Sequence, residues 1–124
     1  MSYRNLDIYK MAFDLFPKAH KASLVLPKYE LYELGSQLRR SSDSVITNIV
    51  EGYGRSVYKN EYYRFLVFSH ASNDETISHL EKIIILYPEL SAEFEILKQK
   101  YNLLGGKINK CKKWVKEYWN ENQS

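Results

Sequence analysis

Residues 94–118 read FEILKQKYNLLGGKINKCKKWVKEY, and this stretch decides the fold class. Its apolar residues recur at alternating steps of three and four positions, which is the spacing of one face of an α-helix. The residues that keep this spacing are Phe94, Leu97, Tyr101, Leu104, Ile108, Cys111, Val115 and Tyr118. A turn at Gly105 and Gly106 would normally reset the spacing, yet Leu104 and Ile108 stay in step across the pair. The stretch therefore predicts one long helix, over residues 89–119, with a soft point at the two glycines.

Three breaks divide the rest of the chain into segments of helical length. Pro27 and Pro88 stand between apolar periodic stretches, and Gly52 and Gly54 precede a polar patch. The spacing between these breaks predicts helices over residues 5–25, 30–54 and 58–87, with a kink or break at Pro17 in the first. The apolar face of the first helix is predicted to contain Leu6, Tyr9, Phe13, Phe16 and His20. The core-facing positions of the third are predicted to include Tyr62, Leu66, Ser69, Asn73, Thr76 and Leu80.

The pattern as a whole indicates a helical protein. No stretch alternates polar and apolar residues as a half-buried strand would. Short connections make neighbouring helices antiparallel, and 124 residues are enough for one hydrophobic core. We therefore predict an all-α fold, an up-down-up-down antiparallel four-helix bundle that spans residues 1–124 as a single domain.

The composition argues against most enzyme and metal chemistry. The one cysteine, Cys111, excludes an intramolecular disulfide and a cysteine-based zinc site, and an isolated thiol fits a reducing cytoplasm. A di-iron bundle needs Glu-x-x-His motifs, and the sequence contains none. It also lacks a glycine-rich phosphate loop, a nucleophile elbow and any apolar run long enough to cross a bilayer. We expect no enzyme activity, no cofactor or metal, no membrane partner and a cytoplasmic location.

A polar row accompanies the apolar row in the predicted helices 30–54 and 58–87. At steps of three and four positions, the two rows contain Gln37, Arg40, Ser44, Asn48, Glu51 and Arg55, and Glu61, Arg64, Phe68, Ser72, Glu75 and His79. Folding the helices back at residues 56–59 predicts four facing pairs, Arg55–Glu61, Glu51–Arg64, Ser44–Ser72 and Arg40–Glu75. Two interpretations stay open: solvated faces with weak ion pairs, or a semi-buried polar seam that fixes helix register or a subunit contact.

The same stretch carries a resemblance to a known family. Residues 37–41 (QLRRS), 44–45 (SV) and 48–52 (NIVEG), followed by Arg55, resemble the signature of certain bacterial four-helix-bundle proteins. The founding members of that family are encoded inside intervening sequences of the large-subunit ribosomal RNA gene. Residues 65–66, 71–72 and Glu75 resemble the second block of the family. The signature and seam positions are Gln37, Arg39, Arg40, Ser44, Asn48, Glu51, Arg55, Arg64, Ser72 and Glu75.

The resemblance covers nearly the whole chain and brings expectations of its own. It implies a four-helix bundle that assembles as a homopentamer and has no known catalytic activity. A relative of the family is the accessory variability determinant protein of diversity-generating retroelements. For that relative, the resemblance implies a basic surface that engages a reverse transcriptase and RNA.

The net charge of +3 conceals an uneven distribution. Residues 98–116 contain seven lysines and no acid, and the remaining 11 basic and 15 acidic residues leave the rest of the chain at −4. The lysines are Lys98, Lys100, Lys107, Lys110, Lys112, Lys113 and Lys116. They form either an ordinary solvated helix face or a surface that attracts phosphates, and the charge also permits an acidic protein or an anionic membrane.

We expect a non-enzymatic homo-oligomer that binds RNA, DNA or a nucleic-acid enzyme through these lysines. The alternative is a purely structural or protein-interaction oligomer with no nucleic-acid role.

Overall fold

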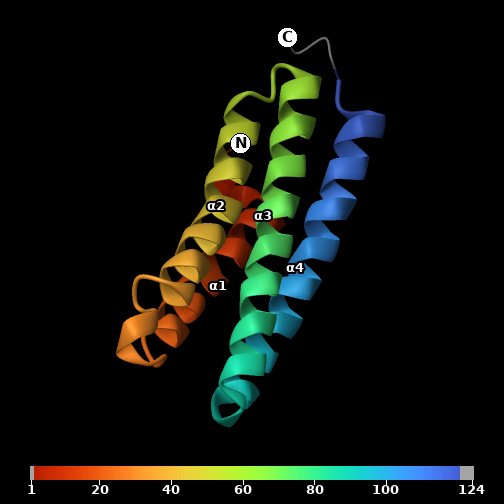
Figure 1. Cartoon of the computed structure of the whole chain (residues 1–124). Coiled ribbons are helices and arrows are strands. Elements are labelled where there is room, and N and C mark those ends of the chain that lie inside the picture. The colour runs from red at the N-terminus through yellow and green to blue at the C-terminus, as the bar shows by residue number, and fades with distance from the viewer. Residues whose placement is uncertain (1, 121–124) are drawn as a thin grey trace.

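The computed structural model describes residues 2–120, and the ends of the predicted 1–124 domain lie outside this range. Four long helices run up-down-up-down as an antiparallel bundle (Figure 1). They are α1 (Asp7–Ser23), α2 (Leu34–Gly54), α3 (Lys59–Leu86) and α4 (Ser91–Tyr118), with short 3₁₀ turns η1 (Tyr3–Asn5), η2 (Lys28–Glu30) and η3 (Pro88–Leu90). Residues 2–120 contain no strand, so the predicted all-α four-helix bundle is confirmed. Within the same residues, no helix combines the length and apolar character needed to span a membrane.

The inward side of α4 follows the predicted spacing, and the helix is unbroken through Gly105 and Gly106. Its buried residues are Phe94, Leu97, Tyr101, Leu104, Gly105, Ile108 and Val115. Tyr118 was predicted on this side but is 68% exposed, because α4 ends there. The chain leaves the helix in an extended conformation at Trp119, and the Trp119 ring packs edge-to-face on Tyr62 with 5.0 Å between centroids.

The inward side of α1 lies one position away from the predicted side. Its buried residues are Ile8, Ala12, Leu15, Ala19, Ala22 and Ser23. Phe13 is 57% exposed, and His20 lies at the surface beside Phe16. The prediction was wrong for Phe13 and His20, whereas Leu6, Tyr9 and Phe16 pack partly buried against the core. The fully buried side shifts because three small alanines let α1 lie close to the bundle, where larger rings would hold it away. Pro17 is exposed, and α1 runs through it without a break.

The helix boundaries differ from the predicted ones mainly between α1 and α2. Helix α2 begins at Leu34 rather than at residue 30, because residues 28–33 form η2 and a turn. Gly35 permits this tight return, since a Cβ there would lie 2.8 Å from the Glu30 carbonyl oxygen. At the other end, α2 continues through Gly52 and ends at Gly54 as predicted, and neither glycine has a positive φ.

Candidate functional site

Short polar side chains join α2 to α3 near the middle of both helices. Ser44 Oγ and Ser72 Oγ lie 2.8 Å apart, which confirms the predicted pair. Asn48 Nδ2 donates to Ser44 Oγ at 3.0 Å and to the Ser44 carbonyl oxygen at 2.9 Å. Because these side chains are short, the two helices approach closely while their polar atoms stay hydrogen-bonded.

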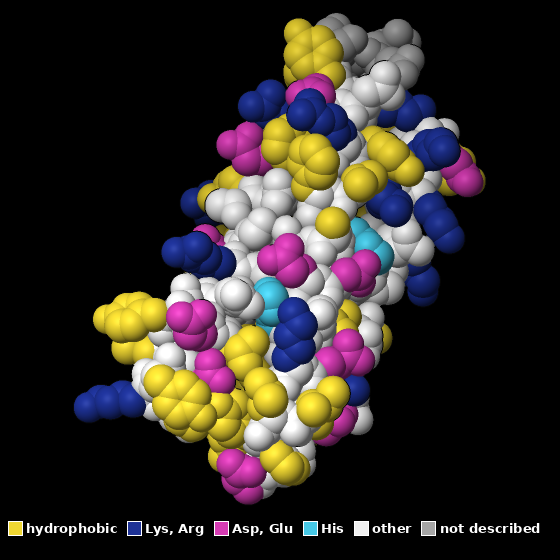
Figure 2. Space-filling view, in the orientation of Figure 1, with side chains coloured by type: hydrophobic (Ala, Val, Ile, Leu, Met, Phe, Trp, Pro, Cys, Tyr) yellow, Lys and Arg dark blue, Asp and Glu magenta, His cyan; other side chains and the backbone are white. Residues whose placement is uncertain are grey.

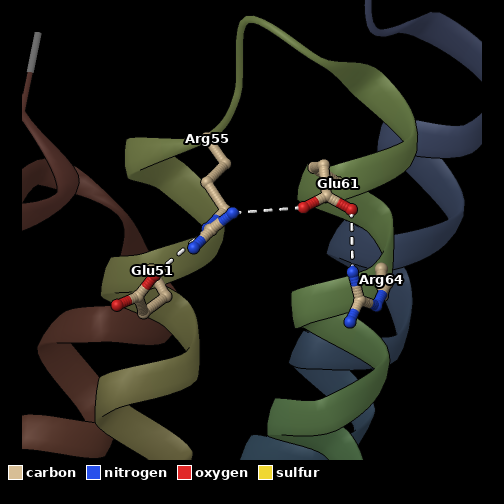
Figure 3. A network of polar contacts seen from close by, with 4 residues as sticks. All are labelled: Glu51, Arg55, Glu61 and Arg64. Atoms are coloured by element: carbon tan, nitrogen blue, oxygen red, sulfur yellow. Dashed lines mark hydrogen bonds and ion pairs between the residues drawn. The ribbon is translucent and has the colours of Figure 1, made fainter.

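Four charged residues form a network where α2 turns back into α3 (Figure 3). Arg55 donates to Glu51 Oε2 at 3.2 Å and to Glu61 Oε1 at 3.3 Å, so the predicted Arg55–Glu61 pair is confirmed. Arg64 donates to Glu61 Oε2 at 3.0 Å. The predicted Glu51–Arg64 pair does not form, because each residue has a nearer partner one turn away on its own helix. Three of the four side chains are at least half exposed, so each ion pair contributes less than about 1 kcal/mol.

The predicted seam does not extend to Arg40. Arg40 is exposed and makes no ion pair within residues 2–120, while Glu75 lies 3.6 Å from His79 Nε2 on its own helix. Gln37 is also exposed, and its side chain makes no hydrogen bond in the described part of the chain. The predicted Arg40–Glu75 pair was wrong because both side chains reach into water, where an ion pair gains little against the entropy lost.

Arg39, a signature position, lies on the other flank of α2 and holds the connection from α1. Its Nη1 donates to Ser23 Oγ at 2.9 Å, and its Nη2 donates to the Leu31 carbonyl oxygen at 2.6 Å. The two donors of one planar guanidinium thus tie the end of α1 and the turn before α2 to α2 itself. Arg39 therefore has a structural role outside the seam.

Three polar residues of α3 face the core and bond across to other helices. Ser69 Oγ donates to a carbonyl oxygen of α2 at 2.8 Å, and Asn73 Nδ2 donates to a carbonyl oxygen of α4 at 2.8 Å. Thr76 Oγ1 lies 2.8 Å from Ser41 Oγ of α2. Sequence reasoning placed the α3 residues toward the core but missed these partners, although a polar side chain in a buried row calls for one. These core-facing residues lie beside the predicted polar seam, which is itself part-buried and hydrogen-bonded at Ser44 and Ser72 and solvated towards both ends. Each open interpretation therefore describes one part of the seam.

Burial favours the neutral forms of three side chains, Tyr62, Cys111 and His79. Burial raises the pKa of the Tyr62 hydroxyl and of the Cys111 thiol, which lie close together. Burial lowers the pKa of His79, and the Lys82 charge lowers it further, while Glu75 acts in the opposite direction. Within residues 2–120, no three His, Cys, Asp or Glu side chains gather as metal ligands. The remaining candidate for a functional site is the charged surface.

We call the seven lysines of α4 the lysine face: Lys98, Lys100, Lys107, Lys110, Lys112, Lys113 and Lys116. Figure 2 shows Lys and Arg side chains gathered along the edge of the molecule over the C-terminal half of α4. Lys98 and Lys112 are half-buried and the other five lysines are exposed. In the described part of the chain, only Lys98 forms an ion pair, with Glu95 at 3.5 Å. Six of the seven ammonium groups therefore lack an acidic partner there.

The lysine face is broad rather than a single row. On its α1 side, Lys107 and Lys110 line a hollow of about 300 Å³ beside Cys111. On its α3 side, Lys116 Nζ lies 5.8 Å from the ring centre of Tyr63. Charges spread in this way suit the diffuse attraction of a polyanion better than the binding of one small anion.

Aromatic side chains stand at the C-terminal end of the lysine face. Trp114 is 49% exposed and Tyr118 is 68% exposed, with 6.3 Å between their ring centroids. Trp119 supports Trp114 from the side, since the two indoles meet edge-to-face at 5.8 Å. Trp119 is itself fixed, because its Nε1 donates to the Ser56 carbonyl oxygen at 2.6 Å. The exposed Trp114 ring is thus held in place by the edge-to-face contact with Trp119.

Comparison with known proteins identifies the relatives of this bundle. A family model described as 23S rRNA-intervening sequence protein matches residues 4–110. The matched region includes α1, α2, α3 with the polar seam, and the part of α4 that carries Lys98, Lys100, Lys107 and Lys110. No curated protein has a significant match to the chain. Since the match covers most of the sequence, the chain belongs to the family of 23S rRNA-intervening sequence proteins.

Proposed function

We propose that this protein is a non-enzymatic homo-oligomer of the cytoplasm that binds nucleic acid, or a nucleic-acid enzyme such as a reverse transcriptase, through its lysine face. The observation that carries the proposal is a helix with six lysines that have no acidic partner within residues 2–120. Membership in a family described by its link to 23S rRNA supports RNA as the first nucleic acid to test, with DNA as the second.

The chemistry of lysine defines what kind of binding to expect. An ammonium group is a point charge that attracts phosphates from many directions, whereas reading of base edges relies largely on the two-pronged guanidinium of arginine. The lysine face contains no arginine. Binding should therefore depend weakly on sequence and strongly on salt, since each neutralised phosphate releases a counterion.

Self-association is supported by an aromatic row along η1 and α1 that ends in the exposed Phe13. The Phe13 ring stacks on Tyr9 at 5.6 Å, and Tyr9 meets Tyr3 edge-to-face at 4.9 Å. Aromatic residues are enriched in protein interfaces, and Phe13 is largely uncovered in the single chain. Five copies, the number that the family resemblance implies, would present five lysine faces, whose weak contacts add through avidity.

One observation favours the alternative of a purely structural or protein-interaction oligomer. Ile96 and Leu103 are both more than half exposed on α4, and Ile96 lines a hollow of about 280 Å³ with Lys18 and Lys100. A protein partner would bury such apolar side chains, whereas a phosphate backbone would not.

Binding of labelled RNA and DNA, titrated against salt, tests the proposal. Replacing Lys107, Lys110 and Lys113 together by glutamate should abolish the binding of RNA and DNA that the wild-type protein shows at low salt. The matched control replaces three exposed lysines outside α4, Lys10, Lys21 and Lys28, by glutamate. Both variants change the net charge equally. If the lysine face is the binding surface, the first variant should lose far more affinity for RNA and DNA than the control.

Two outcomes would contradict the proposal. Binding that persists unchanged from low to high salt would exclude phosphate attraction as its source. A monomeric mass in sedimentation would contradict both the nucleic-acid oligomer and the structural alternative, since each requires self-association.

A further inference from the structure

Trp114 is an exposed aromatic residue set among lysines, and its environment distinguishes it from the other exposed rings. Lys110 precedes it by four positions, one turn of the helix, and Lys113 is its immediate neighbour. About half of Trp114 is accessible to solvent, because Trp119 contacts it edge-to-face and does not cover it fully. The chain thus leaves an aromatic surface open next to positive charges.

Trp119, which links Trp114 to the core, gives the Trp114 ring a fixed orientation. Trp119 contacts both Trp114 and the buried Tyr62, and its indole N–H is bonded to the main chain at Ser56. A contact series therefore runs from the core to the surface. A ring that is already ordered loses less conformational entropy when a ligand stacks on it than a free ring does.

The order of side chains along α4 matches an extended polyanion with accessible bases. Lys107, Lys110, Trp114 and Tyr118 follow steps of three, four and four, so they share one flank over about 16 Å of helix. Cationic groups beside aromatic rings are the pattern by which proteins hold single strands, with phosphates on the charges and bases on the rings. In a duplex the base faces are already stacked on one another and cannot use these rings.

We propose that the lysine face binds unpaired nucleotides, with a base stacked on Trp114, a neighbouring base on Tyr118, and the adjoining phosphates at Lys107 and Lys110. This inference rests on the proposed function and specifies its ligand as single-stranded nucleic acid. Glu117 lies one turn from Trp114 on the exposed side and makes no ion pair within residues 2–120. Its carboxylate opposes the phosphates, so Glu117→Gln should tighten binding.

The test compares oligo(U) with an RNA duplex of equal length, in the same low-salt buffer, by gel shift and by tryptophan fluorescence. The protein contains two tryptophans, Trp114 and Trp119. A base stacked on Trp114 should quench the fluorescence of the wild-type protein. In Trp114→Leu the fluorescence comes from Trp119 alone, and oligo(U) should no longer quench it. Trp114→Leu should also weaken oligo(U) binding about tenfold, the typical effect of one lost stacking contact, without weakening duplex binding. Trp114→Phe, which keeps an aromatic face, should restore most of the affinity.

Separate outcomes overturn the two proposals. Oligo(U) binding that is unaffected in Trp114→Leu, or duplex binding weakened to the same extent, would overturn the stacking site while leaving a nucleic-acid-binding lysine face. If the protein binds neither oligo(U), nor the RNA duplex, nor oligo(dT), the proposed nucleic-acid binding by the lysine face is overturned, and the stacking site with it. Circular dichroism and sedimentation of Trp114→Leu check that the bundle and its assembly are intact. If that variant does not fold, Tyr118→Leu, altered at an exposed residue at the helix end, replaces it in the same comparison.

Discussion

The contacts among α2, α3 and α4 and the outer side of α4 are both rich in polar groups, but hydrogen bonds within the chain join many groups of the first set and few of the second. Between the helices, Ser44 meets Ser72, and Asn73 donates to the main chain of α4. On the outer side of α4, six lysines have no acidic partner within residues 2–120. The difference separates residues that hold the bundle together from residues left available to another molecule.

Two adjacent glycines of α4 show the same difference in packing. A Cβ on buried Gly105 would lie 2.9 Å from Asn73 Nδ2, whereas a Cβ on exposed Gly106 would have no atom within 4 Å outside its own helix. Gly105 therefore permits the close approach of α3 and α4. Gly106 has no such role and weakens the helix, since glycine is a poor helix former.

The largest expected effect on stability comes from placing a larger side chain at Gly105, where α3 and α4 approach closely. Gly105→Val should lower the free energy of unfolding by about 2–3 kcal/mol, because the added side chain displaces Asn73 and strains the contact with α3. Gly106→Ala, its neighbour and control, should raise the same quantity by up to about 1 kcal/mol. Urea denaturation of both variants measures the difference. Equal effects at the two positions would show that α3 and α4 do not approach each other as described.

A smaller effect is expected from the buried hydroxyl of Thr76, which joins α3 to α2 in the core. The Thr76 hydroxyl lies 2.8 Å from Ser41 Oγ and 2.9 Å from the Ser72 carbonyl oxygen. Thr76→Val keeps the side-chain shape but removes both contacts, so it should lower the free energy of unfolding by about 1–2 kcal/mol.

Thr47 offers the matched control for this substitution. Among residues 2–120, its hydroxyl bonds only to the Asp43 carbonyl oxygen of its own helix, at the surface. Thr47→Val should therefore change the free energy of unfolding by less than about 0.5 kcal/mol. Comparable losses in the two valine variants would contradict a special role for the buried contact.

The sequence alone predicts the inward side of a helix wherever polar residues surround its apolar row. Helix α4 is such a case, because lysines surround its apolar row, and its helical range was predicted to within two residues at each end. In α1 both the aromatic row and the alanine row are apolar, so spacing selects neither. Their size decides, since Ala12 and Ala19 fit against the bundle where Phe13 does not.

The seam was predicted best where side chains are short. Serines at matching positions leave little choice of partner, so Ser44 and Ser72 meet as predicted. A long side chain such as Glu51 or Arg64 can reach several partners, and neighbours on its own helix compete with the facing one. The partners of Arg39, a signature position, were not predicted for a further reason: they belong to the α1–α2 connection, whose path no periodic pattern describes.

The smallest effect on stability is expected on the outer side of α4. Replacing Lys107, Lys110 and Lys113 together by glutamine should change the free energy of unfolding by less than about 0.5 kcal/mol, since these lysines form no ion pair within the described residues 2–120. Glu61→Gln, which breaks two ion pairs near the seam's turn, is the comparison and should cost up to about 1 kcal/mol. Thermal and urea unfolding measure both.

The same lysine variant should lose most of its affinity for oligo(U), and the slope of log affinity against log salt should become shallower by about 2. A stability loss above about 1 kcal/mol would instead mean that the lysine stems cover apolar surface and belong to the fold. Unchanged stability combined with lost binding would assign the lysines a role that the bundle itself does not need, because their charges would then matter only to a molecule outside the chain.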